Sequence, residues 1–153
     1  MACLLFLLTQ GSSQSRPSTH KHYALFGVIF GCLGALDQVL LALYLWSTYQ
    51  PLSVIPLMSE MALPVHLGTI ALFASALLLV YGSLLMQRRS TMKGGWVNLL
   101  AGTLVPIPTY VYFAFFSQLT LLNWLGPSGF LLLVPAVMSG VVGIFAAQSL
   151  HPD

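Results

Sequence analysis

The chain has 153 residues, of which 58% are hydrophobic and 5% are charged, with a net charge of +2. Soluble domains carry about 25% charged residues, so five basic and three acidic side chains cannot cover a water-exposed surface. This composition indicates an integral membrane protein. It excludes a nucleic-acid-binding protein, because the sequence contains no basic stripe.

Four apolar runs follow one another, each long enough for a transmembrane helix, which needs about 20 residues. They are Tyr23–Ser47, Leu63–Met86, Trp96–Ser117 and Gly129–Gln148. They are continuously apolar, which is typical of helices and not of the alternating strands of a barrel. The sequence therefore predicts an all-α integral membrane protein, a bundle of four transmembrane helices forming one membrane domain over residues 23–148.

The basic residues orient this bundle. They form one group before the first run and one between the second and third: Arg16, Lys21, Arg88, Arg89 and Lys93. With four crossings both groups lie on the same side, which the positive-inside rule makes cytosolic. We therefore expect residues 1–22 and 149–153 to be cytosolic, in the endomembrane system or the plasma membrane. The short apolar start at residues 1–13 favours a tail that touches the membrane, and a cleaved signal peptide is the alternative.

Asp37 is the single charged residue inside the four runs. A charged side chain at the bilayer centre costs about 2.5–3.5 kcal/mol on insertion scales, so such residues normally have a partner. Gln38 follows it, and Tyr44 lies two helical turns further along the same face as Asp37. We expect Asp37, Gln38 and Tyr44 to form an intramembrane polar site. One interpretation is a structural or partner contact, and the other is cation or proton conduction.

Two sets of small residues predict close helix–helix contacts, because small residues at a spacing of four let backbones approach. The sets are Gly27, Gly31 and Ala35 in the first run, and Ser139, Gly143 and Ala147 in the last. They either pack on each other within the monomer, or one of them binds another protein. Three prolines predict helix kinks, Pro106, Pro108 and Pro135. These kinks indicate either a hinge or site, or ordinary bundle geometry.

Catalytic and cofactor motifs are absent from the sequence, and Glu60 and His66 lack the third ligand that a metal site needs. We therefore expect a protein that is not an enzyme and that has no cofactor and no metal. The leading hypothesis is an accessory or structural subunit that acts by helix packing in a larger membrane complex, with membrane lipids and either a membrane-protein partner or further copies of itself as partners.

Two alternatives stand beside this hypothesis. The first is an oligomeric channel or small carrier for ions or protons that uses Asp37, with Tyr44 and the third helix lining the path. The second is a lipid- or sterol-binding protein, which rests on the aromatic residues of the third run. These residues are Tyr110, Tyr112, Phe113, Phe115 and Phe116.

Overall fold

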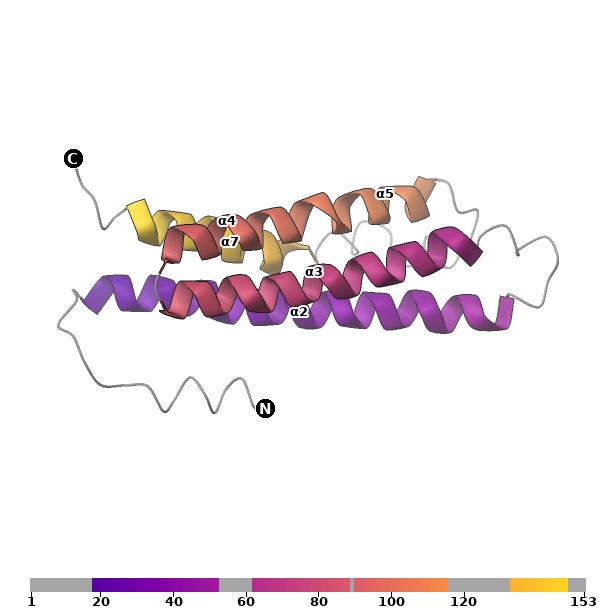
Figure 1. The fold of residues 1–153 in the computed structure, drawn as a ribbon, viewed down its shortest axis with the longest axis horizontal. Coiled ribbons are helices and arrows are strands. Elements are labelled where there is room, and N and C mark those ends of the chain that lie inside the picture. The colour runs from indigo at the N-terminus through magenta and orange to yellow at the C-terminus, as the bar shows by residue number, and fades with distance from the viewer. Residues whose placement is uncertain (1–17, 53–61, 89, 116–132, 149–153) are drawn as a thin grey trace.

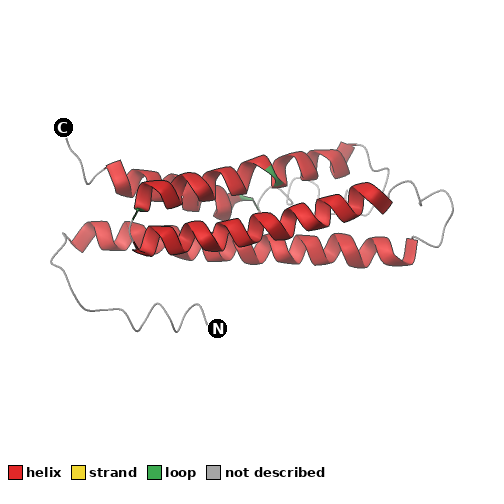
Figure 2. Ribbon diagram, in the orientation of Figure 1, coloured by secondary structure: helices red, strands yellow, loops and turns green. Residues whose placement is uncertain are grey.

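The computed structural model describes residues 18–52, 62–88, 90–115 and 133–148, and nearly all of them are helical (Figure 2). The helices are α2 (Ser18–Leu52), α3 (Ala62–Arg88), α4 (Thr91–Leu104), α5 (Pro106–Phe115) and α7 (Val134–Gln148). The predicted all-α class is therefore confirmed for this part of the chain. Residues 1–17 and 149–153 lie outside the described part. They contain the apolar start, most of the predicted N-terminal tail and the whole predicted C-terminal tail. Glu60 also lies outside the described part.

The helices pack as a four-helix bundle in which α4 and α5 follow one another along a single rod (Figure 1). Around the bundle, α2 contacts α3, α3 contacts α4, α4 contacts α7, and α7 contacts α2. Neighbours run antiparallel: Gly27 lies beside Gly143, and Gly34, further along α2, lies beside Ala136, which comes earlier in α7. An up-and-down bundle with short connections is thus the architecture.

Two of the helices have the length and composition of a membrane span. In α2 the candidate span is His22–Ser47, and in α3 it is Leu63–Arg88, each of 26 residues. The last helix, Val134–Gln148, is apolar but shorter. The predicted first and second helices thus correspond to α2 and α3, which extend past both expected ends, while residues 129–132 of the predicted fourth helix lie outside the described part.

The predicted third helix is divided at Val105. Ser90 caps the beginning of α4, since its Oγ accepts a hydrogen bond from the backbone N–H of Lys93 at 3.4 Å, and α4 ends at Leu104. Pro106 and Pro108 then occupy the first turn of α5, where helix N–H groups have no intrahelical acceptor and proline is tolerated. Pro135 likewise lies in the first turn of α7.

Two threonine hydroxyls bond carbonyls near this break. Thr103 Oγ1 donates to Leu99 O at 2.7 Å, and Thr109 Oγ1 donates to Val105 O at 2.8 Å. Each bond runs back four residues, a pattern that often bends helices. Pro106 and Pro108 have no N–H to donate to the carbonyls of Gly102 and Leu104, four residues earlier. The two threonine hydroxyls bond other carbonyls, those of Leu99 and Val105.

Small residues set the distances between the helices. A Cβ built on Gly140 of α7 would lie 2.6 Å from the backbone nitrogen of Leu99 in α4, and a Cβ on Gly95 would lie 2.8 Å from the backbone nitrogen of Ile144. Real side chains do not approach backbone atoms so closely, so α4 and α7 pack almost backbone to backbone. The apolar centre of the bundle is correspondingly small and alanine-rich, and it contains Ala35, Ala76, Leu79, Ala101 and Ala136.

We predict that Gly140→Ala destabilises the bundle by about 1–3 kcal/mol, the range typical of overpacking, because the rigid backbone of Leu99 blocks the new methyl group. The sign is diagnostic, since glycine to alanine in an unobstructed helix gains about 1 kcal/mol. Gly27→Ala is the matched control: its Cβ would meet the Sδ atom of Met86 at 3.2 Å, and that flexible side chain can shift. SDS titration of the detergent-purified protein measures the free energy of unfolding of both variants. Equal unfolding free energies for Gly140→Ala and Gly27→Ala would contradict this packing.

Candidate functional site

A buried polar layer joins all four sides of the bundle. Asn98 of α4 is fully buried, and its Nδ2 donates hydrogen bonds to Ser83 Oγ of α3 at 3.2 Å and to Ser139 Oγ of α7 at 2.7 Å. Ser139 Oγ in turn donates to the backbone carbonyl of Gly27 in α2 at 2.6 Å. We call Ser83, Asn98, Ser139 and the Gly27 carbonyl the polar layer. Its bonds link helices that are up to 112 residues apart in sequence.

Glycines make room for the polar layer. A Cβ on Gly31 would overlap Ser83 Oγ and would lie 2.8 Å from Asn98 Nδ2, and a Cβ on Gly82 would overlap Asn98 Oδ1. Gly82 also lies against Gly94, whose Cβ would overlap the Gly82 carbonyl. The amide of Asn98 therefore fits only because Gly31 of α2 and Gly82 of α3 carry no side chain.

Some buried polar atoms in the described residues have no hydrogen-bond partner. They are Asn98 Oδ1, both amide atoms of Gln38, and Thr69 Oγ1. Gln38 is 1% exposed and lies two turns beyond Gly31 on the same buried face of α2. Gln38, one of the three residues of the predicted polar site, is thus packed inside the bundle, and its amide forms no hydrogen bond within the described part of the chain.

Ser75 contributes a second interhelical bond. Its Oγ donates to the carbonyl of Ala101 at 2.5 Å, joining α3 to α4. The layer between Ser75 and Asn98 is apolar and contains Leu79, which is fully buried. The polar groups inside the bundle thus form separate contacts and not one continuous file.

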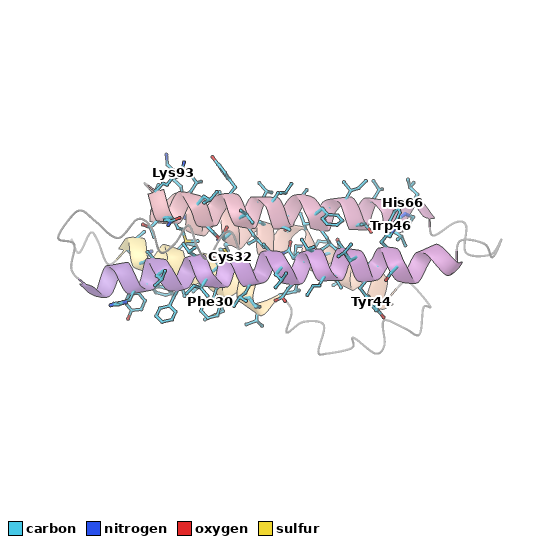
Figure 3. All side chains as sticks on the ribbon, turned by 90° about the horizontal axis from the view of Figure 1, so that it is seen from below. Phe30, Cys32, Tyr44, Trp46, His66 and Lys93 are labelled. Atoms are coloured by element: carbon cyan, nitrogen blue, oxygen red, sulfur yellow. The ribbon has the colours of Figure 1, made fainter. Side chains whose placement is uncertain are left out.

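Asp37 lies apart from these contacts. It is half-buried, as are Phe30 and Tyr44, and the three residues share one flank of α2 because they repeat every seven residues. Figure 3 shows Phe30 and Tyr44 on the side of α2 that faces away from α3, whereas Trp46 points toward α3. Among the described residues Asp37 forms no ion pair and no hydrogen bond. The predicted polar site is therefore divided, with Gln38 inside the bundle and Asp37 and Tyr44 on its flank.

The two predicted small-residue faces lie opposite each other. A Cβ on Gly27 would lie 3.6 Å from the carbonyl oxygen of Ser139 and 3.7 Å from the backbone nitrogen of Gly143, and Gly31 and Ala35 are buried beside them. Ala147, one turn beyond Gly143, is half-buried. Most of this small-residue surface is therefore used inside the chain and is covered by another of its own helices.

The two ends of the bundle differ in chemistry. At one end the rings of Trp46 and His66 lie 5.0 Å apart at an interplanar angle of 48°, while Lys93 lies at the opposite end (Figure 3). An aromatic pair at one end and basic residues at the other are typical of the two interfaces of a membrane. No group of three potential metal ligands occurs among the described residues.

Sequence reasoning missed the polar layer. Asn98 is the single asparagine inside the four predicted runs, and an amide in an apolar helix is a signal for an interhelical hydrogen bond. Gly82 and Ser83 were not singled out either, because their role depends on the rotation of α3 relative to α4. The position of Asn98 in an apolar run is therefore a signal in the sequence that identifies it as a candidate for an interhelical hydrogen bond.

Comparison with protein-family models, curated proteins and solved structures found no match to this chain.

We predict that the side chains of Asn98 and Ser139 are energetically coupled. In a double-mutant cycle with Asn98→Ala and Ser139→Ala, the coupling should be at least about 0.6 kcal/mol, the average for hydrogen bonds between membrane helices, for which the largest values are about 1.7 kcal/mol. Asn98→Ala combined with Ser75→Ala is the control, because Ser75 bonds the Ala101 carbonyl and shares no partner with Asn98. That pair should be additive within about 0.5 kcal/mol. Additivity in both cycles, measured by SDS unfolding, would contradict the polar layer.

Proposed function

We propose that the chain is a four-span membrane protein with both termini in the cytosol, and that it serves as a non-enzymatic accessory or structural subunit of a larger membrane complex. The observation that carries the proposal is Asp37, a half-buried carboxylate midway along an apolar helix without a cation beside it in the described residues. The endomembrane system or the plasma membrane is the proposed location.

The outer surface of the bundle supports a membrane setting. Large apolar side chains face outward, among them Leu67, Ile70 and Leu77 of α3, which expose 58%, 65% and 72% of their surface. Soluble monomers rarely expose contiguous apolar patches larger than a few hundred Å². The polar residues Asn98 and Ser139 lie inside instead. Apolar side chains outside and hydrogen-bonded polar ones inside suit a helix bundle in lipid.

The charge pattern supports a partner. All Lys and Arg residues lie at positions 16, 21, 88, 89 and 93, the ends that we assign to the cytosol. Along α2, Lys21 is roughly 24 Å from the level of Asp37 at 1.5 Å per residue. No Lys or Arg lies within an apolar run at the depth of the carboxylate, so we infer that the opposite charge comes from another chain. A partner with a basic residue in a transmembrane helix supplies it.

The packing argues against a conduction path through one bundle. Leu79 is fully buried between Ser75 and the polar layer, and Leu72 is fully buried on the other side of Ser75, so the described residues form no continuous polar file. Tyr44 lies on the side of α2 that faces away from α3 (Figure 3), and Asp37, seven residues earlier, is half-buried on the same flank. The alternative of an ion or proton pathway therefore requires several copies of the chain around a shared axis. The aromatic side chains that motivated the lipid-binding alternative lie outside the described side chains.

We predict that the tagged wild-type chain, extracted from its native membrane in mild detergent, migrates with other proteins as a complex larger than its own 16.6 kDa. Asp37→Leu should remove most of the chain from that complex, because it deletes the charge that pairs with the partner. Gln38→Leu is the matched control: Gln38 lies inside the bundle and has no bond to lose in the described residues, so the complex should persist. Native mass and stoichiometric composition are the measurements.

Either of two outcomes would overturn the proposal. A wild-type chain that purifies alone and stable from its native membrane is not a subunit. A homo-oligomer unaffected by Asp37→Leu would favour the channel, which is then tested by ion and proton flux after reconstitution.

A further inference from the structure

Resting on the proposed function, we propose which surface receives the partner and what the partner carries there. The surface is one flank of α2, and its occupant is a transmembrane helix of another protein with a Lys or Arg at the depth of Asp37. The lining residues repeat at the heptad positions of a left-handed helix pair. They are Phe26, Phe30, Leu33, Asp37, Leu40 and Tyr44, and we call them the heptad seam.

The heptad seam remains accessible in the described structure. Phe26, Leu33 and Leu40 expose 52%, 46% and 55% of their surface, and Phe30, Asp37 and Tyr44 are half-buried. The seam lies at the edge of the α2–α7 contact, since Gly34, three residues before Asp37, packs against Ala136. A helix that packs there extends the bundle laterally and leaves its interior unchanged.

Apolar exposure alone does not separate a docking surface from one that meets lipid, because lipid also favours outward-facing Leu and Phe. Asp37 decides between them. It is the central residue of the Phe30, Asp37 and Tyr44 row, and lipid tails offer no hydrogen bond and no opposite charge. A polar residue at one such position of a paired helix also fixes the register and the choice of partner. The seam thus combines apolar contact area with one charge that selects its partner.

The position of Asp37 along α2 also sets the depth of the partner's basic residue. At 1.5 Å per residue, Asp37 lies roughly 14 Å from the level of Trp46 and roughly 21 Å from that of Tyr23. These two aromatic residues mark the expected outer and inner interfaces. The partner's Lys or Arg should therefore lie in the outer half of its own apolar segment, within about one helical turn of the level of Asp37.

The two small-residue faces of the chain are excluded as the main docking surface. Gly27 and Gly31 are buried against α7 and the polar layer, and Gly143 is buried between α2 and α4. A partner that used them would first have to separate α7 from α2. The heptad seam requires no such rearrangement, and it carries Asp37, a carboxylate that forms no ion pair or hydrogen bond with the described residues.

Site-specific photo-crosslinking in native membranes tests the inference with the full-length chain. p-Benzoylphenylalanine replaces Phe26 or Tyr44 in the seam, and Leu25 or Leu43 on another outward face of α2 as matched controls. The seam positions should give a crosslink to one defined protein with at least tenfold the yield of the controls. Asp37→Leu should abolish that crosslink, and Asp37→Glu, which keeps the charge, should retain it.

The crosslinked protein has to meet a chemical criterion. Its sequence must contain a Lys or Arg in the outer half of an apolar segment. Replacing that residue by Leu should abolish the crosslink, and exchanging the two charges, with Asp37→Lys and the partner's basic residue changed to Asp, should restore it. A crosslinked protein without such a residue, or one indifferent to the exchange, would overturn the inference.

Other outcomes separate this inference from the proposed function. A complex that persists while crosslinks arise equally from Leu25 and Leu43 would overturn the seam and leave the subunit proposal standing. Crosslinks to a second copy of this chain would replace the proposed partner by self-association. Crosslinks to lipid alone, together with a chain that purifies by itself, would overturn both.

Discussion

The hydrogen bonds of Asn98 fix how the helices are rotated about their axes. The amide reaches Ser83 on α3 and Ser139 on α7, and Ser139 reaches the Gly27 carbonyl on α2. Gly31 and Gly82 must face the same point, because any side chain there would overlap these groups. An apolar interface between membrane helices has little hydrophobic preference for one rotation over another. The polar layer supplies that preference, and the exposed flank of α2 follows from it.

The rotation separates two residues that are neighbours in sequence. With Gly31 facing Asn98, Gln38 also points inward. Asp37, about 100° around the helix, then lies on the flank with Phe30 and Tyr44. The residues that pack the bundle are thus buried inside it, while the carboxylate of Asp37 lies at its edge. We infer that the bundle needs no further helix to pack its interior, whereas the Asp37 carboxylate needs an opposite charge. A helix of another protein with a basic residue supplies that charge.

The sequence predicted the fold more completely than the site. Continuous apolar runs identify α2 and α3, and Pro106 marks the division between α4 and α5, because length and proline chemistry are local properties. The bridging role of Asn98 was missed, since it depends on which faces of α3, α4 and α7 meet, and runs that are apolar all round carry no periodic signal for this. Asp37 and Gln38 point about 100° apart on any helix, but which of the two faces the interior depends on the rotation of α2, which the sequence does not reveal.

The central claim is that Asp37 is paired with a cation in the assembled state, and its chemical reactivity tests this most directly. Dicyclohexylcarbodiimide modifies protonated carboxyl groups in apolar surroundings, and mass spectrometry of the peptide separates Asp37 from Glu60 and Asp153. In native membranes at neutral pH we expect Asp37 to be protected, because a carboxylate paired with Lys or Arg stays ionised. The same residue should become modified once detergent has separated the chain from its complex. Equal modification of Asp37 in the native membrane and in the isolated chain would contradict the account.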